Sequence, residues 1–250
     1  MQYLYAVEIS GFEDTKVHYK NLIGGIHSVH KLFILQTSLM LEILKKAKNK
    51  YEISLTGISG NISQKYSNSK FSNNKFLNQI SSSQKIIELV SLEDFINWDI
   101  DYKFINLIYD LIIKSDIYSE YLKEKTDSYE IDSKFVYDFY KDIIVPNEKF
   151  QSLIEEKNIF WMDDFALVNS LVLKFIKKLT PKNLNSLFYF ELFSNLSDKK
   201  YSEDLANLSL NNFKSNNDLI NNYLTNWDLD RIAKIDLVII NLAITEIKEF

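Results

Sequence analysis

The pattern of apolar and polar residues is helical over most of the chain and is most regular near its end. In residues 226–250, apolar positions recur every three or four residues, with one break at Glu246. These positions are Ile232, Ile235, Ile239, Leu242 and Ile247. Further apolar residues fill the other sides: Leu237, Val238, Ile240 and Ile244. A helix that is apolar nearly all round is normally buried within a bundle, so we predict a central helix here.

One narrow polar stripe interrupts this predicted helix. It consists of Lys234, Asn241, Thr245 and Lys248, which share one face at helical spacing. We predict that this stripe is the only side of the helix that meets water or a partner.

A tryptophan followed by acidic residues precedes three of the apolar segments, at Trp98, Trp161 and Trp227. In the last copy, Asp228 or Asp230 can accept hydrogen bonds from the first turn and suits the positive end of the helix dipole. We therefore predict that each tryptophan packs before a helix that an acid caps. Repeated use of a good cap explains this pattern better than duplication of a repeat unit.

Caps and apolar spacing place the other helices. The predicted ranges are 1–9, 14–50, 83–90, a short piece from Ser91 or Asp94 to Asn97, a helix after Asp99 or Asp101, 117–125 behind Ser115-Asp116, 135–144 behind Asp132 or Ser133, 148–157 after Pro146-Asn147, 165–179, and a pair within 183–217. Alternation predicts a short strand at 51–58, and Gly24-Gly25 predicts a weak point. The Ser-, Asn-, Lys- and Gly-rich residues 57–83 predict a linker.

Composition narrows the fold to all-α. The chain has 250 residues with only 5 glycines and 2 prolines, which disfavours a fold of many short strands. We divide it into N-terminal helices with the polar linker, residues 1–82, and a helical domain, residues 83–250. With 46% hydrophobic residues, the chain can bury a core. We expect a cytoplasmic protein, because no basic region with an early apolar run and no long apolar stretch occurs.

Charge and chemistry exclude several classes of function. Cysteine is absent, which removes disulfides and thiolate chemistry, and the net charge of −5 gives no general attraction to nucleic acid. Arg231 is the only arginine. The acid pairs Asp163-Asp164 and Glu155-Glu156 diverge on a helix, since adjacent side chains point about 100° apart. We find no catalytic or phosphate-binding motif, and predict neither an enzyme nor a cofactor.

Two local patterns have both a binding interpretation and a plainer one. His27 and His30 share a helix face, but a metal site needs further ligands, so solvent-facing or partner-facing histidines are the better interpretation. Lysines and aromatic residues alternate in the 65–85 stretch: Lys65, Tyr66, Lys70, Phe71, Lys75, Phe76 and Lys85. Such a pattern can bind single-stranded RNA, although a linker is the favoured interpretation.

One sequence pattern near the C-terminus consists of Trp227, Asp230-Arg231-Ile232, Ile235-Asp236 and 241–247. With the segments named below, this pattern resembles a known family, the transcription antitermination factor NusB in its long form with an insertion. Asn241 and Thr245 depart from it, because the family usually has a basic residue and an aromatic there. Gln2, Leu4 and Tyr5 match an N-terminal segment, and 143–148 with 155–164 resemble the middle region.

The resemblance implies a helical bundle built from the N-terminal helix, the Trp161 segment and the Trp227 segment, with residues from about 14 to 150 as a helical insertion. It implies binding of boxA-type RNA together with the small-subunit ribosomal protein NusE, and an indirect link to the RNA polymerase elongation complex. The implied RNA- or partner-binding residues are Gln2, Tyr5, Arg231 and Asp236. For Arg231 we favour pairing with Asp228 or Asp230 at the helix entry.

Departures from the family keep two alternatives open. The family carries an arginine-rich run before the segment of Tyr5 and further helices after the last segment, and neither is present in this sequence. One alternative is therefore a protein-interaction module that has lost RNA binding. The other is an accessory domain related to those attached to RNA methyltransferases, which would need a catalytic partner. We also expect the last helix to lack part of its cover and to expose apolar surface.

Overall fold

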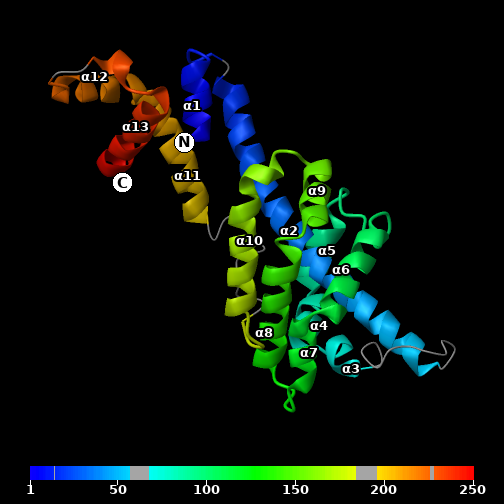
Figure 1. The fold of residues 1–250 in the computed structure, drawn as a ribbon. Helices are drawn as coiled ribbons and strands as arrows, with labels where there is room; N and C mark the ends of the chain where they lie inside the picture. Colours follow the sequence, from blue (N-terminus) through cyan, green and yellow to red (C-terminus); the bar gives the residue numbers. More distant parts are fainter. Residues whose placement is uncertain (14, 57–67, 184–195, 226–227) are drawn as a thin grey trace. The chain divides into compact units, whose positions relative to one another are not determined.

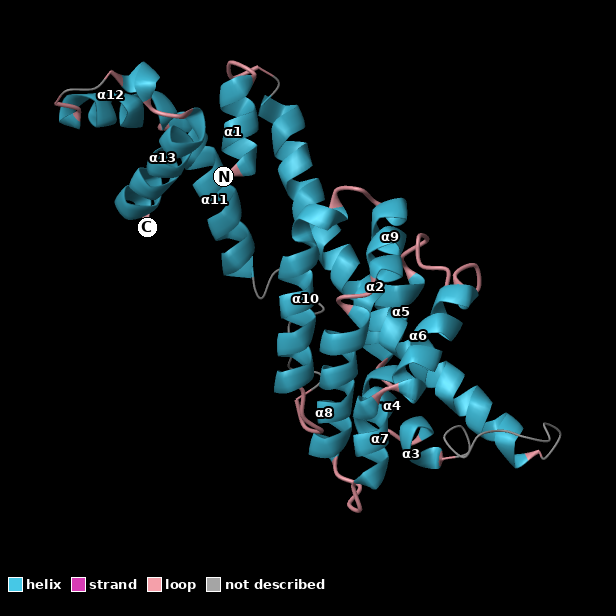
Figure 2. Ribbon diagram, in the orientation of Figure 1, coloured by secondary structure: helices cyan, strands magenta, loops and turns pink. Residues whose placement is uncertain are grey.

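A computed structural model describes residues 1–13, 15–56, 68–183, 196–225 and 228–250. Every regular element in these ranges is helical, as Figure 2 shows, which confirms the predicted all-α class. The described chain divides into two compact units. The first unit comprises Met1–His27 with Glu191–Phe250, and the second comprises Ser28–Phe190.

The first unit contains both ends of the chain. Its elements are α1 (Gln2–Ile9), the start of α2 (Thr15–Leu55), α11 (Leu196–Asn211), α12 (Phe213–Tyr223), a 3₁₀ turn η4 (Leu229–Arg231) and α13 (Lys234–Glu249). In Figure 1, α1 lies at the blue end of the colour scale and α13 at the red end. The two helices pack against each other and both contact α11.

The second unit contains the rest of α2 and the middle of the chain. Its elements are α3 (Ser69–Ser72), α4 (Lys75–Ser81), α5 (Gln84–Ser91), α6 (Tyr102–Lys114), α7 (Asp116–Lys123), α8 (Tyr129–Phe139), a π-helical segment η1 (Tyr140–Ile144), α9 (Glu148–Lys157) and α10 (Trp161–Lys178).

The division into units differs from the predicted domains. The predicted boundary at residue 82 lies inside the second unit. Helix α10, which begins with Trp161, belongs to the second unit, where it packs on α8 and α9, whereas α1 and α13 belong to the first.

Helix α2 provides the centre of the second unit. Each residue from Leu32 to Met40 is buried, so this part of the helix is covered on all sides. Its polar residues in that stretch make hydrogen bonds locally or across the core, although Gln36 Nε2 is buried without a partner. The Tyr140 hydroxyl donates to Gln36 Oε1 at 2.7 Å, and Trp98 Nε1 donates to Ser38 Oγ at 2.9 Å. A buried polar group without such a partner would cost about 1–3 kcal/mol.

Helix α2 also bears on two local predictions. It runs to Leu55, so the predicted strand at 51–58 is wrong where the chain is described. A few alternating residues are too weak a signal against a helix that is already propagating, because each further residue adds a hydrogen bond. The α-helix also continues through Gly24 and Gly25, where no neighbouring side chain approaches.

The described part of the predicted linker is folded. Within its described part, residues 68–83, Asn68 accepts a hydrogen bond from Lys70 N and begins α3, while Asn74 accepts from Leu77 N and begins α4. The apolar side chains between these caps are buried: Phe71, Phe76, Leu77 and Ile80. The asparagines and serines that suggested a loop are therefore caps of short helices. Residues 57–67 lie outside the described residues.

Other caps were predicted with mixed success. Ser115 accepts from Tyr118 N and Asn147 from Phe150 N, which confirms the starts of α7 and α9. Helix α8 begins earlier than predicted, behind Ser128. Asp132, one of the predicted caps, is buried instead and accepts from the Tyr121 hydroxyl at 2.6 Å. The short helix predicted up to Asn97 is also wrong, since residues 93–101 form turns and bends.

The orientation of α13 differs from the prediction in the middle of the polar stripe. Lys234 and Lys248 are exposed as predicted, but Asn241 and Thr245, predicted to face water or a partner, are fully buried beside α12. The apolar residues predicted to be buried include Ile235, Ile239 and Ile247, and all three are exposed. The helical spacing was correct, but the spacing alone does not say which side of a nearly all-apolar helix faces the core.

A chain of hydrogen bonds holds this buried face. Asn216 of α12 donates through Nδ2 to Thr245 Oγ1 at 3.0 Å, and its Oδ1 accepts from Lys248 Nζ at 3.3 Å. Asn241 Nδ2 donates to Asn217 Oδ1 at 2.7 Å and to Leu237 O at 3.0 Å. We call these residues of α12 and α13 the polar seam. Its bonds favour this rotation of α13, because another rotation would leave the buried Asn216 without the partners that Thr245 and Lys248 provide.

The first prediction concerns this seam. Asn216→Ala removes the partner of Thr245 and Lys248 and should destabilise the α12–α13 pair by about 1–3 kcal/mol. Hydrogen exchange at the backbone amides of α12 and α13 measures the loss. Asn222→Ala, an exposed asparagine on the same helix, is the matched control and should change exchange little. Equal protection in both variants would contradict the role of the seam.

The second prediction concerns alkaline pH. Burial raises the pKa of Tyr118 to about 12, and burial also raises the pKa of Tyr121, Tyr129 and Tyr140. The unfolded chain loses these protons near pH 10, whereas the folded chain keeps them. Stability of the second unit should thus be full below about pH 10 and fall above it, by roughly 1.4 kcal/mol per pH unit for each such tyrosine.

Urea unfolding between about pH 9 and about pH 11 checks this slope. In a Trp227→Phe background, fluorescence reports on Trp98 and Trp161, which are both buried in the second unit. Tyr118→Phe removes one of the raised groups and should make the slope shallower. Tyr223→Phe, at an exposed tyrosine, is the control and should leave it unchanged. A slope indifferent to Tyr118 would refute the assignment.

Candidate functional site

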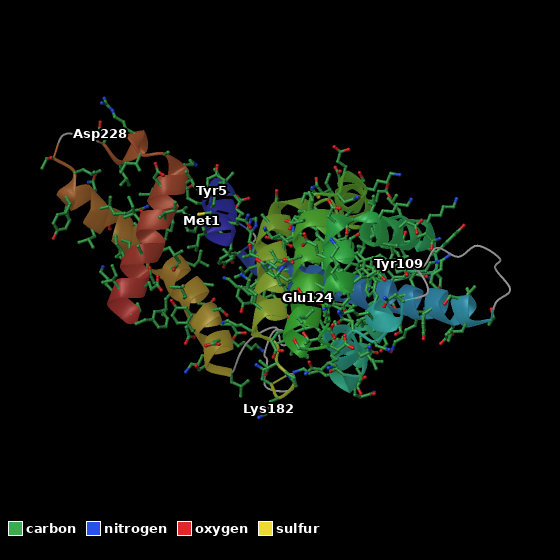
Figure 3. All side chains as sticks on the ribbon, turned by 60° about the horizontal axis from the view of Figure 1, so that its bottom comes forward. Met1, Tyr5, Tyr109, Glu124, Lys182 and Asp228 are labelled. Atoms are coloured by element: carbon green, nitrogen blue, oxygen red, sulfur yellow. The ribbon has the colours of Figure 1, made fainter. Side chains whose placement is uncertain are left out.

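The surface around α1 and α13 contains three of the four predicted site residues. Helix α1 turns Tyr3, Leu4 and Val7 into a small core that also contains Val238 of α13. The opposite face of α1 exposes Gln2 and Tyr5. Tyr5 is labelled in Figure 3, beside Met1 on the same helix.

An ion pair joins the end of α1 to the start of α13. Lys234 Nζ lies 3.6 Å from Glu8 Oε1, and Tyr5 is three residues before Glu8 on α1. Asp236 is exposed in the first turn of α13, two residues after Lys234. A carboxylate there is stabilised by the positive end of the helix dipole. The structure thus places Gln2, Tyr5 and Asp236 on two helices that contact each other.

The turn between α1 and α2 has an unusual backbone. Gly11 and Phe12 both have positive φ, of 68° and 65°. Phe12 is held there by a hydrogen bond from its N–H to Val7 O at 2.9 Å and by an edge-to-face contact with Phe213, with ring centroids 5.1 Å apart. This left-handed conformation is costly for a residue with a side chain. The contacts of Phe12 with α1 and α12 therefore hold the turn and fix the direction in which the chain leaves α1.

Arg231, the fourth predicted residue, lies apart from the other three in its contacts. It ends the turn η4, which packs against α12. Its Nε is 3.8 Å from Asp228 Oδ2, so the expected pairing at the helix entry is present. Both side chains are largely exposed, and such a pair contributes little to stability. Neither Asp228 nor Asp230 caps α13, which begins after Ala233.

The exposed face of α13 adds residues that sequence reasoning did not assign to the site. Ile239 is 46% exposed and Ile247 is 83% exposed, with Ile235 and Ile240 also exposed. On α1, Met1 and Ile9 are exposed as well. A run of large apolar side chains on two packed helices is more than the single exposed leucine or isoleucine that needs no explanation. Asn241 and Thr245, four residues apart, are the sequence signal that could have located it, since two polar side chains on one helical face can bond to a neighbouring helix when buried.

Two of the three tryptophans, Trp98 and Trp161, are buried in the second unit and hold their segments against α2. Trp161 begins α10 and donates through Nε1 to Ser28 Oγ of α2 at 2.6 Å, while Trp98 is buried in the turns before α6. Trp227 lies outside the described residues. Asp163 and Asp164 fall in the first turn of α10, where burial and then the charge of Asp163 raise the pKa of Asp164.

The metal interpretation finds no support within the described ranges. No cluster of three or more His, Asp or Glu side chains there could hold a metal ion. His27 is exposed on α2, and His18 Nε2 lies 3.2 Å from Ser10 Oγ.

The alternating lysine and aromatic stretch is not an open RNA surface in its described part. Phe71 and Phe76 are buried in the core of the second unit and cannot stack on bases. Lys70 Nζ donates to Glu124 O at 2.6 Å, and Lys75 Nζ donates to Asp127 O at 2.6 Å. These lysines hold the loop between α7 and α8. Lys65 and Tyr66 lie outside the described residues.

Comparison with models of known protein families, with curated proteins and with solved structures found no match to this chain. Among the helices that the structure describes, none has the length and apolar character needed to cross a membrane.

Proposed function

We propose that the chain is a NusB-like transcription antitermination factor. It binds boxA-type RNA together with the small-subunit ribosomal protein NusE, and through them acts on the RNA polymerase elongation complex. The proposal starts from the sequence resemblance. The observation that carries it further is the placement of Tyr5 and Asp236, which are exposed on two helices that pack against each other.

The chemistry of this surface suits a contact shared by a protein and an RNA. The Tyr5 ring is partly exposed and can stack on a base or pack on a protein side chain. Asp236 offers a carboxylate that accepts hydrogen bonds, and it repels phosphates. We therefore assign Asp236 to the protein partner and Tyr5, with Gln2 beside it, to either side of the joint surface. Affinity for RNA then comes mainly from the assembled complex.

The third prediction tests these assignments. Asp236→Asn removes only the charge and should weaken binding of the ribosomal protein by about tenfold, since a charge-assisted hydrogen bond contributes about 1.5–3 kcal/mol. Tyr5→Ala should weaken RNA binding by the mixture of both proteins by about fivefold or more, the range of one lost base stack. Fluorescence anisotropy of a boxA-type RNA, with and without the ribosomal protein, measures both.

The controls are exposed residues of the same unit. Asp218→Asn on α12 and Tyr223→Ala at the end of α12 repeat the substitutions elsewhere and should leave both affinities unchanged. If the Asp236 and Tyr5 variants behave like these controls, the site assignment is wrong. If the unaltered chain binds neither the RNA nor the ribosomal protein at low salt, the proposed function itself fails.

A second candidate function is a protein-interaction module without RNA binding, favoured by the exposed isoleucines of α13. Their burial against a partner would contribute about 25 cal/mol per Å² before the costs of association. In this case the partner is a protein with an apolar centre to its binding surface, and the RNA plays no part.

The fourth prediction separates the two candidates. Ile239→Lys should leave stability within about 0.5 kcal/mol, because the side chain is already half exposed. If the chain is a protein-interaction module, the variant's affinity for the ribosomal protein, or for any other protein partner, should fall tenfold or more in a pull-down titration. In that case neither the variant nor the unaltered chain binds RNA. Ile87→Lys, at an equally exposed isoleucine of α5, is the control. Retained partner binding by Ile239→Lys would remove the α13 face from the interface.

A further inference from the structure

The second unit carries a basic and aromatic groove that the proposed function does not use. Helices α8 and α10 pack side by side, as Figure 2 shows, and a groove of about 380 Å³ lies along them. Its side chains include two tyrosines and two lysines: Tyr129, Tyr137, Lys134 and Lys177. The turn after α10, at Leu179, Thr180 and Pro181, closes one end.

Lys177 of α10 lines this groove, and three further lysines lie within a few residues of it in the sequence. Residues 165–183 contain four lysines and no acid, although the whole chain has a net charge of −5. The lysines are Lys174, Lys177, Lys178 and Lys182, and all four are exposed. Within the described ranges, the ammonium groups of Lys174, Lys178 and Lys182 make no ion pair or hydrogen bond. Lys182 is labelled in Figure 3, on the turn that follows α10.

Two of these lysines have a plainer role. Lys177 and Lys178 fall in the last turn of α10, where cations stabilise the negative end of the helix dipole. That role accounts for neither Lys174, a turn earlier, nor Lys182, beyond the helix. It also does not account for the aromatic side chains across the groove. Helix-end electrostatics therefore explain only part of the cluster.

The aromatic side of the groove lies on α8. Tyr129 and Tyr137 are eight residues apart, so they share one face of the helix about 12 Å apart along its axis. Lys177 Nζ lies 4.6 Å from the centroid of the Tyr137 ring, which places a cation and a ring together. The Tyr129 ring is anchored by its hydroxyl, which donates to Gln79 Oε1 at 2.5 Å.

The acidic groups near the groove stand on α8, and one of them, Glu130, keeps its negative charge. Glu130 lines it, in the first turn of α8, where hydrogen bonds from its own backbone N–H and from Ser128 lower its pKa. Asp138 forms an ion pair with Lys134 on the same helix. The side of α10 therefore keeps its positive charge, and an anionic chain meets more lysine than carboxylate there.

We propose that this groove binds a single-stranded RNA segment, with phosphates on the lysines of α10 and a base against the Tyr137 ring. Lysines supply charge and rings supply stacking, the combination by which proteins bind single strands without reading their sequence. An acidic polypeptide could use the lysines, but it would leave the rings without a role. The inference goes beyond the proposed function, because the groove lies in the other unit and needs no ribosomal protein.

The fifth prediction tests the lysines with a labelled short oligouridylate, which has no boxA sequence. The full chain carrying Lys174→Gln, Lys177→Gln and Lys178→Gln should bind it about tenfold more weakly in fluorescence anisotropy. Three phosphate contacts to a single strand give a slope of about −2 in log K against log salt, so the unaltered chain should lose about 20-fold in affinity between about 50 and about 200 mM salt. The triple variant should lose most of this salt dependence.

A matched triple variant removes the same charge elsewhere in the unit. Lys123→Gln, Lys125→Gln and Lys149→Gln, all at exposed positions, should reduce binding less than twofold. Circular dichroism checks that both variants fold. Tyr137→Leu keeps apolar bulk but removes the ring and should lose about fivefold, whereas Tyr137→Phe should bind like the unaltered chain.

Three results would overturn the inference. The first is no binding of oligouridylate by the unaltered chain at the lower salt. The second is an equal loss in both triple variants, which would mean diffuse electrostatics. The third is displacement of the RNA by a polyglutamate peptide at comparable concentration, which would make the groove a site for acidic polypeptides. None of these bears on the Asp236 and Tyr5 experiment, which uses boxA-type RNA and the ribosomal protein.

Discussion

The second unit depends on a helix buried on all sides. From Leu32 to Met40, α2 has no face in contact with water, so its polar side chains must find partners within the core. Gln36 meets the Tyr140 hydroxyl from the π-helical segment η1, and Ser38 accepts from Trp98. Nearer its start, Ser28 accepts from Trp161. Each bond ties α2 to a different part of the surrounding chain, and each would be costly to leave unmade.

The same constraint acts on the first unit, with a different outcome. In α13 the buried face is polar, and the seam with Asn216 provides hydrogen-bond partners for it. The apolar side chains of α13 are then left at the surface. Asn216 and the Nδ2 group of Asn241 are paired on this face, while Asn241 Oδ1 is buried without a hydrogen-bond partner. The bonds that are made limit the cost of burying these amides, because an unpaired buried group costs about 1–3 kcal/mol. Forming the seam therefore accounts both for the rotation of α13 and for its exposed isoleucines.

Sequence reasoning predicted the fold where the signal was local. Helical spacing gave the all-α class, and the caps Ser115 and Asn147 begin helices where predicted. A cap is recognisable because its partner lies two or three residues away in the sequence. The same local signal misled in residues 68–83, where asparagines that cap short helices were interpreted as a loop.

What could not be predicted required knowledge of distant partners. Asp132 is of a residue type that often caps helices, but here it accepts hydrogen bonds from the Tyr121 hydroxyl and from Lys75 N. Rules of local spacing do not identify these two partners. The rotation of α13 is set by Asn216 on another helix, and periodicity does not identify that neighbour. For the candidate site, the resemblance selected Tyr5 and Asp236, and the packing of α1 on α13 places them on two contacting helices. The groove of α8 and α10 was not predicted, because Tyr137 and Lys177 are far apart in sequence.

The two surfaces differ in chemistry, and the difference bears on how such a protein would engage RNA. The α1 and α13 surface combines apolar side chains with Asp236, a combination that suits a protein partner more than a bare phosphate chain. The α8 and α10 groove combines lysines with a tyrosine ring, a combination that suits a phosphate chain with its bases more than a protein partner. A chain with a net charge of −5 and one arginine has little general attraction for RNA. If it binds RNA, it must do so by concentrating charge locally or by sharing the contact with a basic partner. The groove provides the first route and the α1 and α13 surface the second, so RNA binding without the partner would have to come from the lysines of α10.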